Sequence, residues 1–165
     1  MRLRRPLAAV LSLAVMIAAG CESAPTAPDP DPDPTPATTM AVAFPGGTLN
    51  AEIAATRSKR DTGLMNRASI APDSGMIFVW PADQSNLAVA FFMRDTHFDL
   101  SIAFLDADRR VLNIEDMTRD TETLHFAVAP FRYAVEAPAG WFAAHGVTAG
   151  AIASFTLPAG VIVDP

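Results

Sequence analysis

From Met40 onward, the apolar residues of this chain occur in short runs, each bounded by glycine, proline or polar residues. Residues 75–80 (GMIFVW) form one such run and residues 87–93 form another. Apolar runs of about four to eight residues between such breakers are typical of buried strands, whereas helices are usually longer. Residues 49–56 instead alternate largely between apolar and polar side chains, which is the period of a half-buried strand. The sequence therefore predicts a mainly β domain.

The remaining apolar segments predict further strands at residues 100–105, 111–114, 131–137 and 151–157. The first two of these flank a polar turn at residues 106–110, so we expect them to form a β-hairpin. A short helix or turn is predicted within residues 57–67, and another helical turn at residues 141–144. Strands at this spacing indicate a single compact barrel- or sandwich-like domain over residues 40–165, with one or two short helices.

Residues 1–20 have the features of a secretory signal peptide. Three arginines (Arg2, Arg4 and Arg5) precede an apolar run over residues 7–19, which is shorter than the roughly 20 residues of a membrane span. The ending Ala-Ala-Gly-Cys21 resembles the lipobox of bacterial lipoproteins, which implies lipidation of the Cys21 thiol and cleavage before it. An ordinary signal peptide with an incidental cysteine is the alternative. We expect an exported lipoprotein that is anchored to a membrane through Cys21 and faces the periplasm, with the outer membrane favoured.

The segment that follows Cys21 has a composition that does not support a packed core. Residues 22–39 contain six prolines and no large apolar residue before the domain starts at Met40. Alternating proline and aspartate favours an extended, polyproline-like chain. We therefore predict that residues 21–39 form a disordered tether between the lipid and the domain.

The charge balance limits the kinds of partner. The chain has 12 basic and 18 acidic residues, and removal of Arg2, Arg4 and Arg5 with the leader leaves nine basic residues, a net charge of −9. Nucleic-acid binding needs clustered basic residues, so we expect no nucleic-acid partner. The charge also disfavours electrostatic adhesion to anionic lipid. Because the chain has a single cysteine, no internal disulfide can form.

Several residue types are candidate ligands for a metal or a sugar. The three histidines (His97, His125 and His145) follow no metal-ligand spacing, so we predict no metal site and no cofactor. Three methionines (Met65, Met76 and Met93) could bind Cu(I), but core packing is the favoured interpretation. Four aromatic residues could stack on a saccharide, although core packing is again favoured. They are Trp80, Phe91, Phe92 and Trp141.

Five sequence blocks together carry a family resemblance. They are residues 60–67 (RDTGLMNR), 75–80 (GMIFVW), 91–96 (FFMRDT), 100–106 (LSIAFLD) and 133–140 (YAVEAPAG). In this order and spacing the chain resembles the domain of unknown function 192 family over residues 41–160. The resemblance implies a compact, β-rich and often exported single domain, and it brings no established activity.

Polar residues at the end of the predicted strand 87–93 form the best candidate site. Met93, Arg94, Asp95 and Thr96 follow one another there, and Asp99 lies just beyond. Loops at strand ends commonly carry binding residues. Two further charged residues of the family blocks, Arg67 and Glu136, could converge on the same place. An arginine–carboxylate pair that merely ties loops together is the structural alternative.

Three functions are compatible with this site. The first and favoured one is a non-catalytic module that binds a small envelope ligand, such as a saccharide or a metabolite. The second is a hydrolase-like enzyme with Asp95 or Asp99 and Glu136 as acid and base. The third is a structural domain that docks onto an envelope complex. The sequence leaves the ligand and the oligomeric state open.

Overall fold

The computed structural model describes residues 38–165. The elements in chain order are β1 (Thr39–Phe44), β2 (Gly47–Ala54), α1 (Arg57–Thr62), β3 (Ser74–Gln84), β4 (Leu100–Leu105), β5 (Val111–Met117), β6 (Phe131–Pro138) and α2 (Trp141–Ala144). The predicted mainly β domain with short helices is thereby confirmed.

The predicted signal peptide, the lipidated Cys21 and almost all of the tether fall outside the described residues. Within residues 38–165, no helix has the length and apolar character that crossing a membrane requires.

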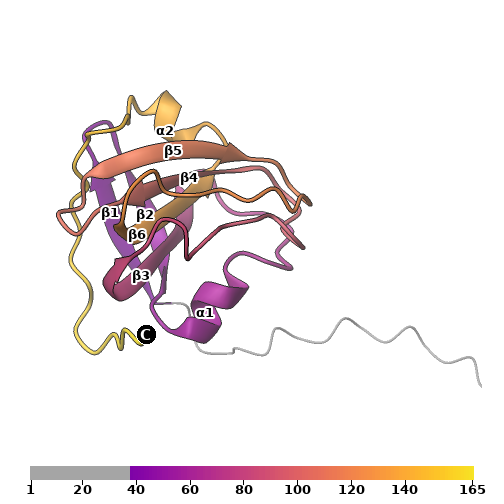
Figure 1. Ribbon diagram of the computed structural model, residues 1–165. Helices are drawn as coiled ribbons and strands as arrows, with labels where there is room; N and C mark the ends of the chain where they lie inside the picture. Colours follow the sequence, from indigo (N-terminus) through magenta and orange to yellow (C-terminus); the bar gives the residue numbers. More distant parts are fainter. Residues whose placement is uncertain (1–37) are drawn as a thin grey trace, which may run out of the picture. The chain divides into compact units, whose positions relative to one another are not determined.

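The strands form one mixed six-stranded sheet in the order β1-β2-β3-β6-β4-β5 (Figure 1). Neighbouring strands are antiparallel except β2 and β3, which are parallel and are connected through α1. The predicted hairpin is confirmed as β4 and β5. Because the outer strands β1 and β5 do not pair with each other, the sheet is not a closed barrel. The sandwich-like alternative describes the domain better.

The first strand, β1, has no counterpart among the predicted strands. It forms a tight hairpin with β2, and Phe44 pairs with Gly47 at the turn. The turn lies directly against His145, so that a Cβ on Gly46 would lie only 1.8 Å from the His145 carbonyl oxygen. Only a residue without a side chain fits at this position.

Two predicted strands are not formed. Residues 87–93 are a loop, in which Leu87 is exposed and Phe91 makes an isolated antiparallel bridge with His125. Residues 151–157 make only isolated bridges, one from Ile152 and one from Ser154. Both segments are apolar because alternate side chains cover the sheet, but neither has a neighbour that offers a continuous ladder of backbone hydrogen bonds.

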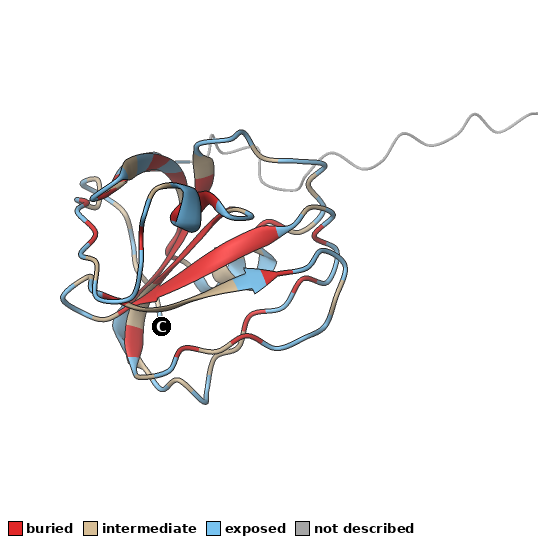
Figure 2. Ribbon diagram, turned by 90° about the horizontal axis from the view of Figure 1, so that it is seen from above, coloured by how far each residue is buried: buried red, intermediate tan, exposed pale blue. Residues whose placement is uncertain are grey.

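Figure 2 shows buried residues along the strands of the sheet. Both faces of the sheet are covered, and successive side chains of β3 alternate between them. Ile77 and Val79 face a core completed by α2 and the C-terminal segment. Met76, Phe78 and Trp80 face a second core, completed by residues from the loops after α1, β3 and β5. Because both faces are buried, consecutive residues of β3 are apolar and form a continuous apolar run in the sequence.

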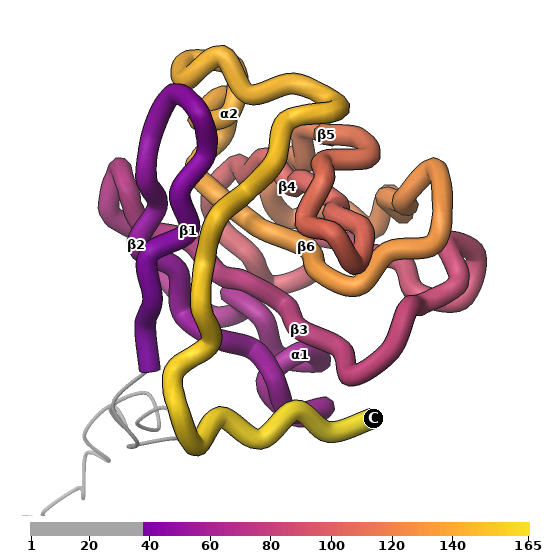
Figure 3. Tube along the Cα trace, turned by 90° about the vertical axis from the view of Figure 1, so that its left-hand side faces the viewer, coloured from indigo at the N-terminus to yellow at the C-terminus, as the bar shows by residue number. Residues whose placement is uncertain are grey.

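The C-terminal segment runs beside β1 and ends near the start of α1 (Figure 3). Ser154 exchanges two backbone hydrogen bonds with Ala43, at 2.9 and 2.8 Å. Further on, the Asp164 carboxylate accepts a hydrogen bond from the backbone N–H of Arg57 at 2.5 Å. The segment thereby fixes the beginning of α1.

Candidate binding site

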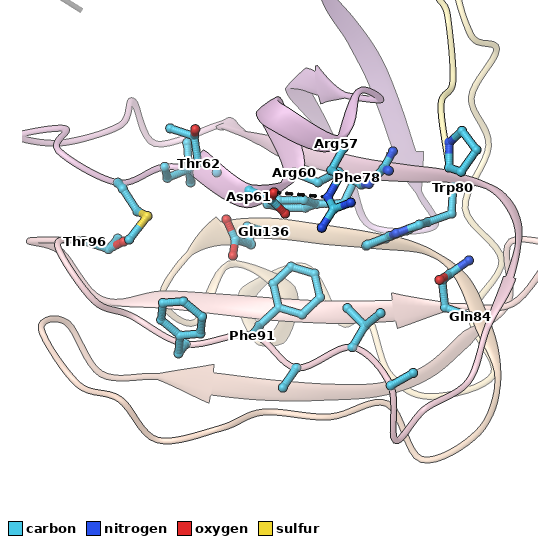
Figure 4. Close-up of a pocket in the computed structure, with 18 residues that line it drawn as sticks. Arg57, Arg60, Asp61, Thr62, Phe78, Trp80, Gln84, Phe91, Thr96 and Glu136 are labelled. Carbon is cyan, nitrogen blue, oxygen red and sulfur yellow. Dashed lines mark ion pairs between the residues drawn. The ribbon is translucent and has the colours of Figure 1, made fainter.

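A cavity of about 630 Å³ lies between α1 and the second core face of the sheet (Figure 4). Its walls come from α1 and the residues just after it, from β3, from the loop at residues 88–92 and from β6. We call it the α1 cavity. A loop–helix connection on one side and a rigid sheet on the other are an ordinary setting for a small-molecule site.

Glu136 is the central polar residue of the α1 cavity. It lies in the middle of β6, opposite Met76 on one neighbouring strand and Ile102 on the other. The residue is only 5 % exposed, and Figure 4 shows its carboxyl group facing the cavity. No group within residues 38–165 forms a hydrogen bond with this carboxyl, although the charge of Arg67 acts on it.

Burial among apolar side chains raises the pKa of Glu136 to about 8, and the positive charge of Arg67 only partly opposes this effect. Burial disfavours the ionised form because the carboxylate would lose its hydration. At pH 7 the neutral acid therefore exceeds the carboxylate by about tenfold. A neutral carboxylic acid has one O–H donor and a carbonyl acceptor, and both are available to a molecule in the cavity.

Three aromatic side chains form one wall of the cavity. Phe91 makes edge-on contacts with Phe78 and Trp80, with ring centroids 5.0 and 6.3 Å apart. Phe78 and Trp80 are themselves stacked, at 6.4 Å. This cluster gives the cavity a rigid apolar surface on which a flat or ring-shaped molecule could rest.

Arg60 connects α1 to the sheet beside this aromatic wall. Its side chain is 6 % exposed, and its guanidinium donates hydrogen bonds to the carbonyl oxygens of Ala55, at 2.5 Å, and Val79, at 3.1 Å. It also donates to Asp164 and lies over the Trp80 ring, 5.4 Å from the centroid. These contacts hold the Arg60 side chain at the cavity wall, where the Asp164 carboxylate balances its charge.

The mouth of the cavity carries more exposed polar groups. Arg57 and Asp61 lie one helical turn apart on α1 and form an ion pair at 3.7 Å, with side-chain exposures of 79 % and 70 %. An exposed pair of this kind contributes little to stability and opens easily. Arg57 can therefore turn toward a ligand at little cost.

Only two of the predicted site residues, Thr96 and Glu136, line the α1 cavity. Met93 is buried in the second core. Arg67 forms a bidentate ion pair with Glu52, in which Nη2 of Arg67 lies 2.9 Å from Oε2 of Glu52. Arg67 therefore does not line the cavity, although its positive charge acts on Glu136.

The other three predicted residues lie outside the cavity. Arg94 forms an exposed ion pair with Glu122 at 2.9 Å, Asp95 has a left-handed backbone with φ of 54°, and Asp99 accepts a hydrogen bond from the backbone of Arg119. Neither Asp95 nor Asp99 lines the cavity with Glu136, so these carboxylates do not share that site as an acid–base pair would.

Several residues of the cavity were missed as site residues in the sequence. Those of α1 are Arg57, Arg60, Asp61 and Thr62. Three of the four aromatic residues considered for stacking, Trp80, Phe91 and Phe92, do line the cavity, whereas Trp141 packs in the other core. Glu136 was predicted from its place in a family block, where it is a single acidic residue among the apolar residues 134–138.

The histidines lie in separate places. His97 pairs with Asp120, and His125 pairs with Glu115 at 2.8 Å. His145 stacks on Trp141. Within residues 38–165, no three His, Cys, Asp or Glu side chains are grouped so that they could hold a metal ion.

Comparison with known proteins places this fold among uncharacterised relatives. The model of the family DUF192, described as Uncharacterized ACR, matches residues 40–155. The chain is similar to a Sinorhizobium meliloti protein provisionally named a transcription regulator, with 26 % identity and a TM-score of 0.68 over 73 % of this chain and 96 % of that one. It is also similar to a Novosphingobium aromaticivorans protein of unknown function, with 29 % identity and a TM-score of 0.63 over 72 % and 84 %. No curated protein matches the chain.

Proposed function

We propose that this chain, which belongs to the DUF192 family, binds a small organic molecule such as a saccharide or a metabolite in the α1 cavity. The observation that carries the proposal is the unpaired carboxyl of Glu136, which is buried and faces a cavity of about 630 Å³. Small-molecule sites have volumes of roughly 300–1,000 Å³ and combine apolar walls with a few polar groups.

The energetic argument concerns the cost of an unpaired buried group. A buried polar group without a hydrogen bond costs roughly 1–3 kcal/mol. Glu136 lies within an otherwise apolar stretch of the sheet, where an apolar residue would pack without this cost. A bound molecule that hydrogen-bonds with the carboxyl would offset it, and the wall formed by Phe78, Trp80 and Phe91 would bind the apolar face of that molecule.

Nucleic-acid binding is not part of the proposal, although the Sinorhizobium relative carries a regulatory name. The chain has 12 basic against 18 acidic residues, and three of the basic ones lie within the first five residues. A surface of this charge repels phosphate.

Ligand binding should change the fluorescence of Trp80 and leave that of Trp141 unchanged. Trp80 lines the cavity, whereas Trp141 packs in the other core and donates a hydrogen bond to Asp73. We expect compounds that raise the melting temperature of the full chain, purified in detergent, to change the emission of the Trp141→Phe variant. The same compounds should cause no change in the emission of the Trp80→Phe variant.

Phe91→Ala tests the aromatic wall in the same assay. Removing a ring from a ligand-binding wall costs about 1.5 kcal/mol or more, so we expect affinity to fall at least about tenfold. Asp83→Ala, at an exposed residue outside the cavity lining, is the control and should bind as the parent does. If no saccharide or metabolite raises the melting temperature, or if binding changes only Trp141, the proposed site is wrong.

We further propose that the domain works at a bacterial membrane, held by lipid on Cys21. The Ala-Ala-Gly-Cys ending of the apolar leader and the proline-rich segment after it support this. Cys21→Ser should abolish incorporation of labelled fatty acid and move the protein from the membrane to the soluble periplasmic fraction. Unchanged membrane fractionation of the variant would contradict the proposed anchor.

A further inference from the structure

We propose that the α1 cavity selects an uncharged sugar ring, two neighbouring hydroxyl groups of which hydrogen-bond to the two oxygens of the Glu136 carboxyl. This inference rests on the proposed function, because it names the chemical class of ligand for the same cavity. It depends on the pairing of the charges around the cavity, on the position of the Glu136 carboxyl and on the hydrogen-bond acceptors of the lining.

Each guanidinium group of the cavity lining is paired with a carboxylate of the same chain. Arg60 pairs with Asp164 at 3.3 Å, and Arg57 pairs with Asp61 at 3.7 Å. These four side chains together carry no net charge. When the exposed pair of Arg57 and Asp61 opens, both groups stay on α1 beside the cavity, so the sum is unchanged. A charged ligand would therefore lose its hydration without gaining a counter-ion of its own.

The Glu136 carboxyl is buried, and no described residue forms a hydrogen bond with it. Among the described residues, the only fully enclosed side-chain nitrogen or oxygen without a partner is Nε2 of His125, so the oxygens of Glu136 are open to the cavity. Figure 4 shows the carboxyl facing this space. Its two oxygens lie side by side, as do two hydroxyl groups on neighbouring carbons of a sugar ring. The two pairs can therefore form two hydrogen bonds at once.

A pair of neighbouring hydroxyl groups suits both protonation states of this carboxyl. Burial raises the pKa of Glu136 to about 8, so the neutral acid predominates at neutral pH. The neutral acid donates to one hydroxyl and accepts from the other, whereas the carboxylate accepts from both. A cyclic amide also offers one donor and one acceptor, but it matches the neutral acid alone. The match to a diol therefore does not depend on the protonation state of Glu136.

Three uncharged polar side chains of the lining add acceptors for further hydroxyl groups. Thr62, Thr96 and Gln84 line the cavity. Each donates a hydrogen bond to a backbone carbonyl oxygen of its own segment, at 3.0, 3.4 and 2.9 Å respectively. Their side-chain oxygens can still accept hydrogen bonds. A sugar supplies several O–H donors for such acceptors, whereas a simple cyclic amide supplies one N–H donor.

The aromatic wall completes the match to a sugar ring. Phe78, Trp80 and Phe91 line the same cavity as Glu136. The C–H groups of a pyranose form an apolar face that packs on aromatic rings, while its hydroxyl groups point outward from the edge of the ring. One molecule can therefore contact the wall with its face and Glu136 with two hydroxyl groups of its edge.

The first experiment compares ligands that differ only in charge. Calorimetry at pH 7, in a detergent without a sugar headgroup, measures the affinity of the full chain for the methyl glycosides of glucose, galactose and mannose. For the glycoside that binds most tightly, two analogues keep the ring hydroxyl groups and carry a carboxylate or an amine at C6. We expect each charged analogue to bind at least about tenfold more weakly than the uncharged glycoside, because its charge enters without a counter-ion.

The second experiment tests the contact between Glu136 and the hydroxyl pair. The 3-deoxy analogue of the same glycoside has no two hydroxyl groups on neighbouring carbons, so we expect the parent chain to bind it at least about tenfold more weakly. Glu136→Leu removes the hydrogen bonds and keeps an apolar side chain of similar size. This variant should bind the glycoside and its 3-deoxy analogue within about twofold of each other.

Two further variants serve as controls for that comparison. Glu136→Gln keeps a donor and an acceptor at the same place, so it should retain the preference for the glycoside over the 3-deoxy analogue. Glu122→Gln, at an exposed residue outside the cavity lining, should bind both compounds as the parent does. A Glu136→Leu chain that unfolds cooperatively but binds neither compound would also support the contact, provided that Glu136→Gln retains the preference.

Several outcomes would overturn the inference. It is wrong if none of the three glycosides binds, if a charged analogue binds as tightly as the uncharged one, or if 2-piperidone, a cyclic amide, binds more tightly than every glycoside. It is also wrong if Glu136→Leu keeps the full preference over the 3-deoxy analogue or if Glu136→Gln loses it. A different compound that changes Trp80 fluorescence would still support the proposed function, whereas the absence of any such compound would overturn the binding site itself.

Discussion

Replacing Glu136 with Gln is expected to raise the free energy of unfolding of the domain at alkaline pH and to flatten its pH dependence. In the folded chain the pKa of Glu136 is about 8, against an ordinary value of 4.5. The folded state therefore holds the proton more tightly than the unfolded state does. The stability that this group contributes is fully present below about pH 4.5, declines as the pH rises, and is lost above about pH 8.

The size of the effect follows from the shift in pKa. Each pKa unit corresponds to about 1.4 kcal/mol, so the parent chain should lose on the order of 3–5 kcal/mol between pH 4.5 and pH 9 through Glu136. Glutamine does not titrate, and its amide is close to the neutral acid in shape. Urea unfolding of both chains at several pH values between 4.5 and 9 measures the difference.

Glu122→Gln provides the matched control, because Glu122 is an exposed glutamate whose pKa is lowered by its contact with Arg94. We expect this variant to follow the parent curve closely. A Glu136→Gln variant that shows the same slope with pH as the parent would mean that Glu136 is ionised in the folded chain, and not the neutral acid that its burial implies.

Gly75→Ala is expected to be the most damaging single-methyl change in the sheet beside the site. A Cβ at Gly75 would lie 2.1 Å from the carbonyl oxygen of Glu136 and 2.5 Å from Cδ2 of Leu49. Gly75 is on β3, where it also pairs with Ala51 of β2. The backbone oxygen cannot move without separating β3 from β6, so we expect a loss of about 3 kcal/mol or more in the free energy of unfolding.

Gly140→Ala serves as the comparison for that prediction. Gly140 has a φ of 76°, but a Cβ there would meet no atom within 4 Å. Its substitution should cost only about 1 kcal/mol, the cost of a left-handed backbone for alanine. Thermal unfolding of the two variants should separate them clearly, and equal losses would show that the packing of β3 against β6 is looser than described.

The sequence predicts those parts of the fold in which pattern and hydrogen bonding agree. The alternation at residues 49–56 lies largely in β2 and the buried run at residues 75–80 lies in β3, and both strands have a hydrogen-bonded neighbour on each side. Residues 87–93 have the same apolar character but form a loop, because their side chains cover the sheet from outside it. Hydrophobic pattern reports burial, and burial does not require a strand.

The candidate site could likewise be predicted only in part from the sequence. Glu136 was predicted from its place in a family block, and it is the one acidic residue of β6, with apolar residues on either side. The residues that complete the cavity are far from it in sequence, since α1 lies between β2 and β3. Arg94, Asp95 and Asp99 were predicted because they are polar residues close together at the end of a predicted strand. In the structure, Arg94 and Asp99 instead contact residues of the loop after β5. Convergence in space depends on the parallel crossover through α1, which no local pattern of residues reveals.

The central claim is that Glu136 is a neutral acid facing the α1 cavity, and carbon NMR tests it most directly. In the full chain labelled with ¹³C at the glutamate side-chain carboxyls, the resonance assigned by its absence from Glu136→Gln is followed from pH 4 to pH 10. We predict that this carboxyl titrates with a midpoint of about 8. A midpoint near the ordinary value of 4.5 would contradict the claim.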